Sequence, residues 1–226
     1  MSWMTRAELR RDDAASAALV SLLRDAGGRD MGHRLVWTLF SDDPDAARGF
    51  LYREAEVGSY LIVSDRPPVD PKGLWSLQSK PYAPDLRAGM RLGFALRANP
   101  TRWVKTSERP QGTRVDVVMH AKKASLAASE KVVWGPDAIE RVALGWLFER
   151  EARLGIRFDR ALCAAGGYRQ VVIARGDERP IRFSVIDYEG VFDVVEPEPL
   201  LDAARNGLGR AKAHGCGLLL IRPANR

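Results

Sequence analysis

Proton transfer near neutral pH is the chemistry that the three histidines of this chain could perform. His33 opens an apolar series at the helical spacing i+3, i+4 and i+7, and Asp30 is a good N-cap for that helix. We therefore expect His33 in the first helical turn, where the helix dipole disfavours the cationic imidazole and leaves a neutral base. The alternative for a lone histidine is a partly buried residue that closes the top of the apolar stripe. The series consists of Val36, Trp37 and Phe40.

Residues 206–222 form a cationic, glycine-rich turn with the sequence NGLGRAKAHGCGLLLIR. Glycine lets the backbone approach a ligand closely, and exposed N–H groups beside Arg210 and Lys212 suit a phosphodiester. The turn is not a P-loop, because Gly-Lys-Ser/Thr is absent, and Lys212 stands where a dinucleotide fingerprint has its third glycine. It could also be a tight helix-to-strand connection or the phosphate cradle of a nucleotide-binding enzyme. Its glycines are Gly207, Gly209, Gly215 and Gly217.

The charges of the chain are segregated around a formal net charge of +6. Residues 91–131 hold nine basic and three acidic side chains, and residues 205–226 hold five basic and no acidic ones. Two cationic regions on an acidic body favour a polyanionic partner such as RNA. For each basic side chain the alternative is an ordinary solvated surface. The RNA-binding candidates in the first region are Arg97, Arg102, Lys105, Lys122 and Lys123.

Composition argues against several protein classes. Hydrophobic residues make up 46% of the chain, enough for a core, and no apolar run approaches the roughly 20 residues of a membrane span. Cys163 and Cys216 alone provide neither a disulfide framework nor a CxxC site. No cluster of Cys, His or carboxylate residues has metal-ligand spacing. We expect a cytoplasmic protein with no cofactor, no metal and no membrane partner.

The elements that must position these residues can be predicted from periodicity. Alternation predicts a strand over 3–10, and helices are predicted over 14–25 and from Asp30 to 41–44. Further strands are predicted over 49–54, 60–64 and 91–98. This order is compatible with a ferredoxin-like or RRM-like unit. The first domain is expected to span 1–118 and to carry His33.

The second half begins with the strongest helix signal, between Pro136 and Gly155. Strands are predicted over 168–175, 181–188, 190–195 and 218–221, with a short helix over 198–205. The fold class is therefore α+β in two halves, the second spanning 119–226 and joined to the first within 105–134. Residues 109–112 are expected to form a mobile loop, and His120 is expected on a basic, hairpin-like surface.

Motifs in family order along nearly the whole chain resemble the type I-E CRISPR-associated repeat endoribonucleases, the CasE family. The glycine turn before the final strand resembles the signature loop of the wider superfamily. Two other segments narrow the resemblance to CasE. They are HRLVWTLF at 33–40, followed by DAAR at 45–48 and FLY at 50–52, and RLGFALRANP at 91–100.

The resemblance implies two tandem ferredoxin-like domains, with His33 aligned to the catalytic histidine of CasE proteins. It implies cleavage of repeat RNA hairpins by the RNA's own 2′-hydroxyl, giving a 2′,3′-cyclic phosphate and a 5′-hydroxyl. It also implies that the protein stays on the mature guide RNA and joins other subunits of the Cascade complex. Such cleavage needs a base, an acid and positive charge at the phosphorane, but no metal. Lys212 and Arg34 are the candidates for that charge.

The chain departs from the CasE pattern at one position. CasE proteins generally carry a tyrosine three residues before the histidine, where this chain has Asp30. The family does not require a histidine in the glycine turn, where this chain has His214. The substitution of the tyrosine leaves a second interpretation open, a Cascade subunit that binds the RNA hairpin with weak or no cleavage.

Overall fold

Two antiparallel sheets organise the chain in a computed structural model, which describes residues 2–11, 21, 31–42, 47–130, 132–175 and 178–224. The helix predicted over 14–25 falls almost entirely outside these residues, and Asp30, the predicted N-cap, falls outside them too. None of the helices in the described ranges is long and apolar enough to cross a membrane.

The first sheet has the strand order β2-β3-β1-β4, and all neighbouring strands are antiparallel. This is the strand order of a ferredoxin-like unit in which a loop replaces the second helix. The helix α2 (Met31–Trp37) and the 3-10 turn η1 (Thr38–Phe40) share a core with this sheet. The strands are β1 (Trp3–Leu9), β2 (Phe50–Glu56), β3 (Ser59–Ser64) and β4 (Trp75–Pro81).

The predicted alternation of the first strand is confirmed. Thr5, Ala7 and Leu9 of β1 are buried, whereas Arg6 between them is exposed. On the other face of the sheet, Met4 contacts a separate core cluster that also contains Leu218 of the second half. The first sheet therefore packs against α2 on one face and against the second half of the chain on the other.

The second sheet has the order β11-β5-β10-β8, again with antiparallel neighbours, and β9 pairs with the long strand β10. Both halves thus share one topology, which confirms two ferredoxin-like domains. The helices of the second half pack on this sheet in one core. The strands are β5 (Arg91–Ala98), β8 (Ile156–Phe158), β9 (Ala164–Arg175), β10 (Glu178–Val194) and β11 (Leu219–Pro223), and the helices are α4 (Pro136–Phe148), α5 (Glu151–Leu154) and α6 (Pro197–Asn206).

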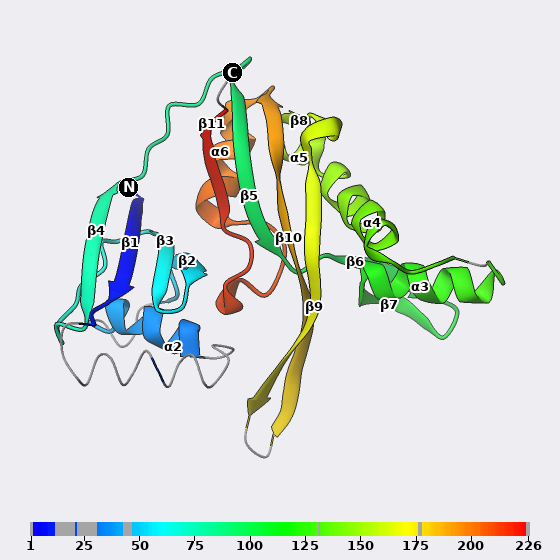
Figure 1. The fold of residues 1–226 in the computed structure, drawn as a ribbon, viewed down its shortest axis with the longest axis horizontal. Helices are drawn as coiled ribbons and strands as arrows, with labels where there is room; N and C mark the ends of the chain where they lie inside the picture. The colour runs from blue at the N-terminus through cyan, green and yellow to red at the C-terminus, as the bar shows by residue number, and fades with distance from the viewer. Residues whose placement is uncertain are drawn as a thin grey trace.

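The predicted assignment of strand 91–98 to the first unit is wrong. β5 forms as predicted, but it pairs with β10 and β11 in the second sheet. The fourth strand of the first sheet is instead β4, which the sequence analysis did not predict. A boundary at residue 118 would therefore cut through the second unit, and the two sheets are connected through residues 82–90 (Figure 1). Alternation predicts a strand but not its partner, which explains this error.

The basic stretch predicted to join the two halves is a folded part of the second unit. It forms the hairpin β6 (Thr101–Thr106) and β7 (Arg109–Asp116), followed by helix α3 (Val117–Ala127). The predicted mobile loop over 109–112 thus lies in β7, and His120 lies on α3. The strands predicted over 181–188 and 190–195 are one strand, β10, which contains Gly190 because a Cβ there would come within 2.7 Å of the Cys163 sulfur.

Candidate active site

His33 lies on α2 within a group of aromatic rings. Its ring centroid is 6.0 Å from that of Trp37 and 6.2 Å from that of Phe50. Tyr52, on β2, lies 6.5 Å away in a stacked orientation. The spacing of four residues between His33 and Trp37 places both on one helix face, as predicted. The half-buried His33 is therefore held by α2 and β2 together.

The glycine turn reaches the same aromatic group from the second unit. Its 3-10 segment η3 (Lys212–His214) ends at His214, whose ring centroid is 6.3 Å from that of His33. The Tyr52 hydroxyl donates a hydrogen bond of 3.2 Å to the carbonyl oxygen of Ala213, and Phe183 of β10 stacks on His214 at 5.3 Å. In Figure 1 this turn, between α6 and β11, lies between the first sheet and the long hairpin of β9 and β10. Both units therefore fix the relative positions of the two histidines.

A cavity of about 270 Å³ opens beside His214. It is lined by Tyr52 from the first sheet, by His214 from the turn and by Arg97 and Arg169 from the second sheet. The Arg97 guanidinium donates hydrogen bonds of 2.9 and 3.0 Å to the two oxygens of Asp187. These bonds raise the pKa of Arg97 against the opposing effect of burial. Asp187 also pairs with Arg53 at 3.2 Å, so one carboxylate holds more than one arginine at this cavity.

Lys212 lies at the opposite end of η3 from His214. Its ammonium group donates a hydrogen bond of 2.6 Å to the carbonyl oxygen of Asn206. The side chain lines a small cavity of about 140 Å³ that also contains Arg48 and Phe50. Burial, followed by the charges of Arg48 and Arg153, lowers the pKa of Lys212. Phe50 lines this cavity together with Lys212, and its ring centroid lies 6.2 Å from that of His33.

The glycines of the turn are required by its backbone. Gly207 and Gly217 have φ values of 74° and 91°, and a Cβ on Gly207 would lie 2.8 Å from a methyl group of Leu51. A Cβ on Gly217 would lie 2.6 Å from the Leu208 carbonyl oxygen. The expectation of exposed N–H groups is wrong for part of the turn. The N–H groups that donate to carbonyl oxygens within the protein are those of Gly207, Leu208, His214, Cys216 and Gly217.

Comparison with known proteins identifies the family. A family model described as CRISPR associated protein matches residues 2–223, nearly the whole chain. The chain belongs to this family.

Relatives within the CRISPR-associated family confirm the resemblance to CasE. The chain is 26% identical to the CRISPR system Cascade subunit CasE of Escherichia coli over 84% of this chain and 90% of that protein. It is 30% identical to the CRISPR-associated endoribonuclease Cse3 of Thermus thermophilus over 64% of this chain and 61% of that protein. A solved structure of CRISPR endoribonuclease Cse3 bound to a 19-nt RNA covers 99% of this chain, with all of its own chain matched, at a TM-score of 0.67 and 25% identity.

The structure distributes the other predicted RNA-binding residues of this CRISPR-associated protein over separate places. Arg34 is exposed on α2, beside the candidate site. Arg102 pairs with Glu149 at 3.1 Å. The hairpin β6–β7 and helix α3 lie at the far end of the molecule from α2 (Figure 1). These elements carry Lys105, Lys122 and Lys123, so the stretch 91–131 does not form one surface around the histidines. An RNA-binding role for these residues remains a prediction.

Three residues of the candidate site were not predicted. The sequence analysis assigns no catalytic role to His214, because the CasE family does not require a histidine in the glycine turn. Its position two residues after Lys212 is the feature of the sequence that could have indicated a role. Tyr52 and Phe183 gave no signal of their own, because an aromatic residue in a predicted strand is usually a core residue. Sequence spacing cannot show that β2, β10 and the turn meet at one point.

Proposed function

We propose that this chain is an endoribonuclease that cleaves CRISPR repeat RNA by acid–base catalysis without a metal ion. It then stays bound to the guide RNA product as a subunit of the Cascade complex. The observation that carries the mechanism is the 6.3 Å separation of the His33 and His214 rings. The RNA substrate and the complex are supported by relatives named Cascade subunit CasE and endoribonuclease Cse3.

The two histidines divide the proton transfers between them. His33 accepts the proton of the 2′-hydroxyl as the 2′-oxygen bonds to phosphorus, and His214 donates a proton to the 5′-oxygen as the P–O5′ bond breaks. Each group must come within about 3 Å of its own oxygen, and rings 6.3 Å apart can satisfy this on two sides of one phosphate. The products are a 2′,3′-cyclic phosphate and a 5′-hydroxyl, and exchange of protons with water restores both imidazoles.

Lys212 contributes positive charge rather than proton transfer. Its ammonium group stays within the glycine turn through the bond to Asn206, and it faces the cavity shared with Phe50. From there it can stabilise negative charge that develops on the non-bridging phosphate oxygens. No three His, Cys, Asp or Glu side chains gather in a metal-binding arrangement within the described residues.

The test uses repeat RNA whose cut linkage carries sulfur in place of the 5′-oxygen, in buffer containing EDTA. A thiolate leaves without protonation, so this RNA does not need the acid. We expect His33→Ala and His214→Ala each to slow cleavage of ordinary RNA. The sulfur substitution should restore the rate of His214→Ala but not that of His33→Ala.

Other results would contradict the proposal in distinct ways. Loss of wild-type activity in EDTA would refute the metal-independent mechanism. Restoration of His33→Ala instead of His214→Ala would show that the assigned roles are wrong. If the wild-type protein binds the RNA but does not cut it, the chain is the RNA-binding Cascade subunit considered from the sequence.

A further inference from the structure

A second cavity, of about 260 Å³, is lined by the part of the glycine turn from Gly207 to Lys212, and His214 is not among its lining residues. Helices α4, α5 and α6 and the turn itself contribute its walls, with buried Trp146 among them. Of the lining residues within the described part of the chain, one is acidic, Asp202, and it is exposed. The basic residues that line the cavity are Arg114, Arg150, Arg153, Arg210 and Lys212.

The arginine at the base of this cavity is held rigidly. The Arg150 guanidinium lies 3.6 Å above the ring of Trp146 and donates a hydrogen bond to the Trp146 carbonyl oxygen. Burial is the main cause that lowers the pKa of Arg150 to about 10; the charge of Glu149 opposes the shift and the charge of Arg153 adds to it. Burial, and then the charges of Arg48 and Arg153, lower the pKa of Lys212, which lines the same cavity. The fold therefore holds three like charges close together, and a bound anion would offset their repulsion.

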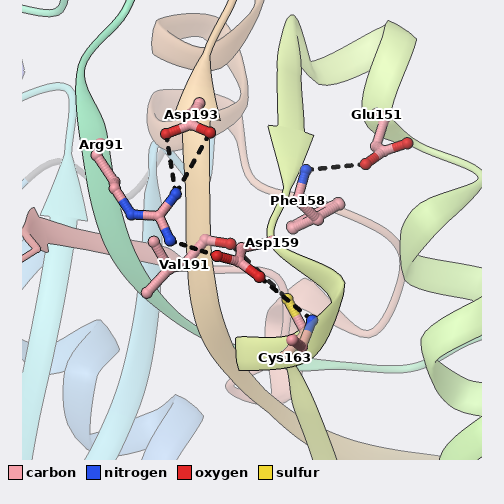
Figure 2. Close-up of polar contacts among 8 residues, drawn as sticks. Arg91, Glu151, Phe158, Asp159, Cys163, Val191 and Asp193 are labelled. Carbon is pink, nitrogen blue, oxygen red and sulfur yellow. Dashed lines mark hydrogen bonds and ion pairs between the residues drawn. The ribbon is translucent and has the colours of Figure 1, made fainter.

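Arginines elsewhere in the described residues form direct ion pairs with carboxylates. Arg91 lies between two carboxylates, bonded to Asp193 at 3.2 Å and to Asp159 (Figure 2). Arg97 is bonded to one carboxylate, that of Asp187, which also pairs with Arg53 and Arg169. In the second cavity, Asp202 is the one carboxylate among the lining residues of the described chain, against five basic residues.

We propose that this cavity binds one phosphate of the RNA strand, at a linkage other than the one that is cut. Planar guanidinium groups suit phosphate oxygens, and about 260 Å³ lies below the usual range for a drug-sized ligand but accommodates a phosphate with its sugar. The turn connects the two sites, because His214 lies at one end of η3 and Lys212 at the other. A strand that crosses the turn therefore presents one phosphate to the histidines and another to the arginines. The proposal rests on the proposed function for its RNA ligand, but it concerns binding rather than cleavage.

The first experiment compares Arg153→Gln with Arg141→Gln. Both residues are exposed, and Arg141 lies on α4 outside the cavity lining, so it controls for the loss of one charge. Affinity is measured over a range of salt concentrations for repeat RNA that carries a 2′-O-methyl group at the cut linkage. We expect Arg153→Gln to weaken binding about tenfold and to reduce the salt slope by about one phosphate contact. Arg141→Gln should bind as the wild type does, and equal effects of both variants would overturn the proposal.

The second experiment locates the phosphate. Single linkages of the RNA are replaced by neutral methylphosphonates on 2′-O-methyl riboses. We expect one linkage, different from the cut one, at which the replacement weakens binding by the wild type but not by Arg153→Gln. If no linkage shows this dependence, or if only the cut linkage does, the proposal is wrong. It is also wrong if inorganic phosphate quenches Trp146 fluorescence while RNA does not compete with it. Because these measurements follow binding to RNA that cannot be cut, a failure of His33→Ala to slow cleavage would refute the proposed function separately.

Discussion

The two sides of the glycine turn differ in chemistry although they are a few residues apart in sequence. On one side, His214 meets His33 among aromatic rings. On the other, Lys212 meets Arg150 and Arg153 around a cationic cavity. Groups that transfer protons should control the cleavage rate, whereas a cluster of fixed cations should control affinity. One short turn can thus separate catalysis from binding. Variants on the histidine side should change the cleavage rate constant, and variants on the cationic side should change the dissociation constant for RNA.

The largest expected effect is on the histidine side. His33→Ala should reduce the single-turnover cleavage rate by about 10²–10⁴-fold and leave RNA affinity within about twofold, because it removes a proton acceptor and no cation. The double variant with His214→Ala should be about as slow as the slower single variant, since groups that act in one step are not additive. The double variant of His33→Ala and Arg153→Gln should cleave at the rate of His33→Ala and bind RNA with the affinity of Arg153→Gln. Full multiplication of the two histidine effects on the rate would contradict a shared step.

Disruption of the glycine turn should destabilise the protein. Gly207→Ala places a Cβ at a φ of 74° and against Leu51, so we expect a loss of roughly 2–4 kcal/mol in the free energy of unfolding. Gly73→Ala is the matched control, because Gly73 has a φ of 65° but no atom within 4 Å of its added Cβ. That variant should lose about 1–2 kcal/mol, and urea unfolding measures both. Equal losses would show that the contact with Leu51 does not constrain the turn.

Lys212 lies where the two sides meet, so its removal should moderately change both the RNA affinity and the cleavage rate. We expect Lys212→Ala to weaken RNA binding about tenfold and to slow cleavage of bound RNA by a similar factor. Filter binding and single-turnover kinetics separate the two effects. Lys72→Ala removes the same charge from an exposed position in the first unit and should change neither. If Lys212→Ala changes affinity alone, Lys212 belongs to the binding side and is not catalytic.

The smallest effect on function is expected where an arginine is already paired. Arg91→Gln should leave RNA affinity and cleavage within about twofold, since two carboxylates compensate Arg91. It should lower the midpoint of thermal unfolding near neutral pH, because the hydrogen bond from Arg91 holds the pKa of Asp159 below its usual value. A carboxyl group whose pKa is lowered by folding stabilises the protein above its usual pKa and loses this effect as the pH falls. The difference from wild type should therefore shrink below about pH 4, and a constant difference would contradict the assignment.

The cationic stretch 91–131 shows why counts of charge in a sequence do not locate a binding surface. Its arginines Arg91, Arg97 and Arg102 pair with carboxylates from distant parts of the chain. In the same order, these partners lie just after β8, on β10 and just after α4. The pairing therefore depends on the tertiary fold. The second cavity, by contrast, is lined by basic residues from three separate segments of the chain, at 114, 150–153 and 210–212. A count of charge over any one segment does not reveal this group.

Several local elements, and the residues able to do acid–base chemistry, could be predicted from the sequence alone. Alternation predicted β1 and β5, the apolar series after His33 predicted α2, and the glycine pattern marked the turn, because each signal depends on neighbours along the chain. Only the tertiary fold brings β5 into the second sheet, His214 beside His33, and individual arginines into ion pairs with carboxylates. Strand pairing and contacts between units are set by packing between residues that are distant in sequence. The spacing of neighbouring residues does not determine that packing.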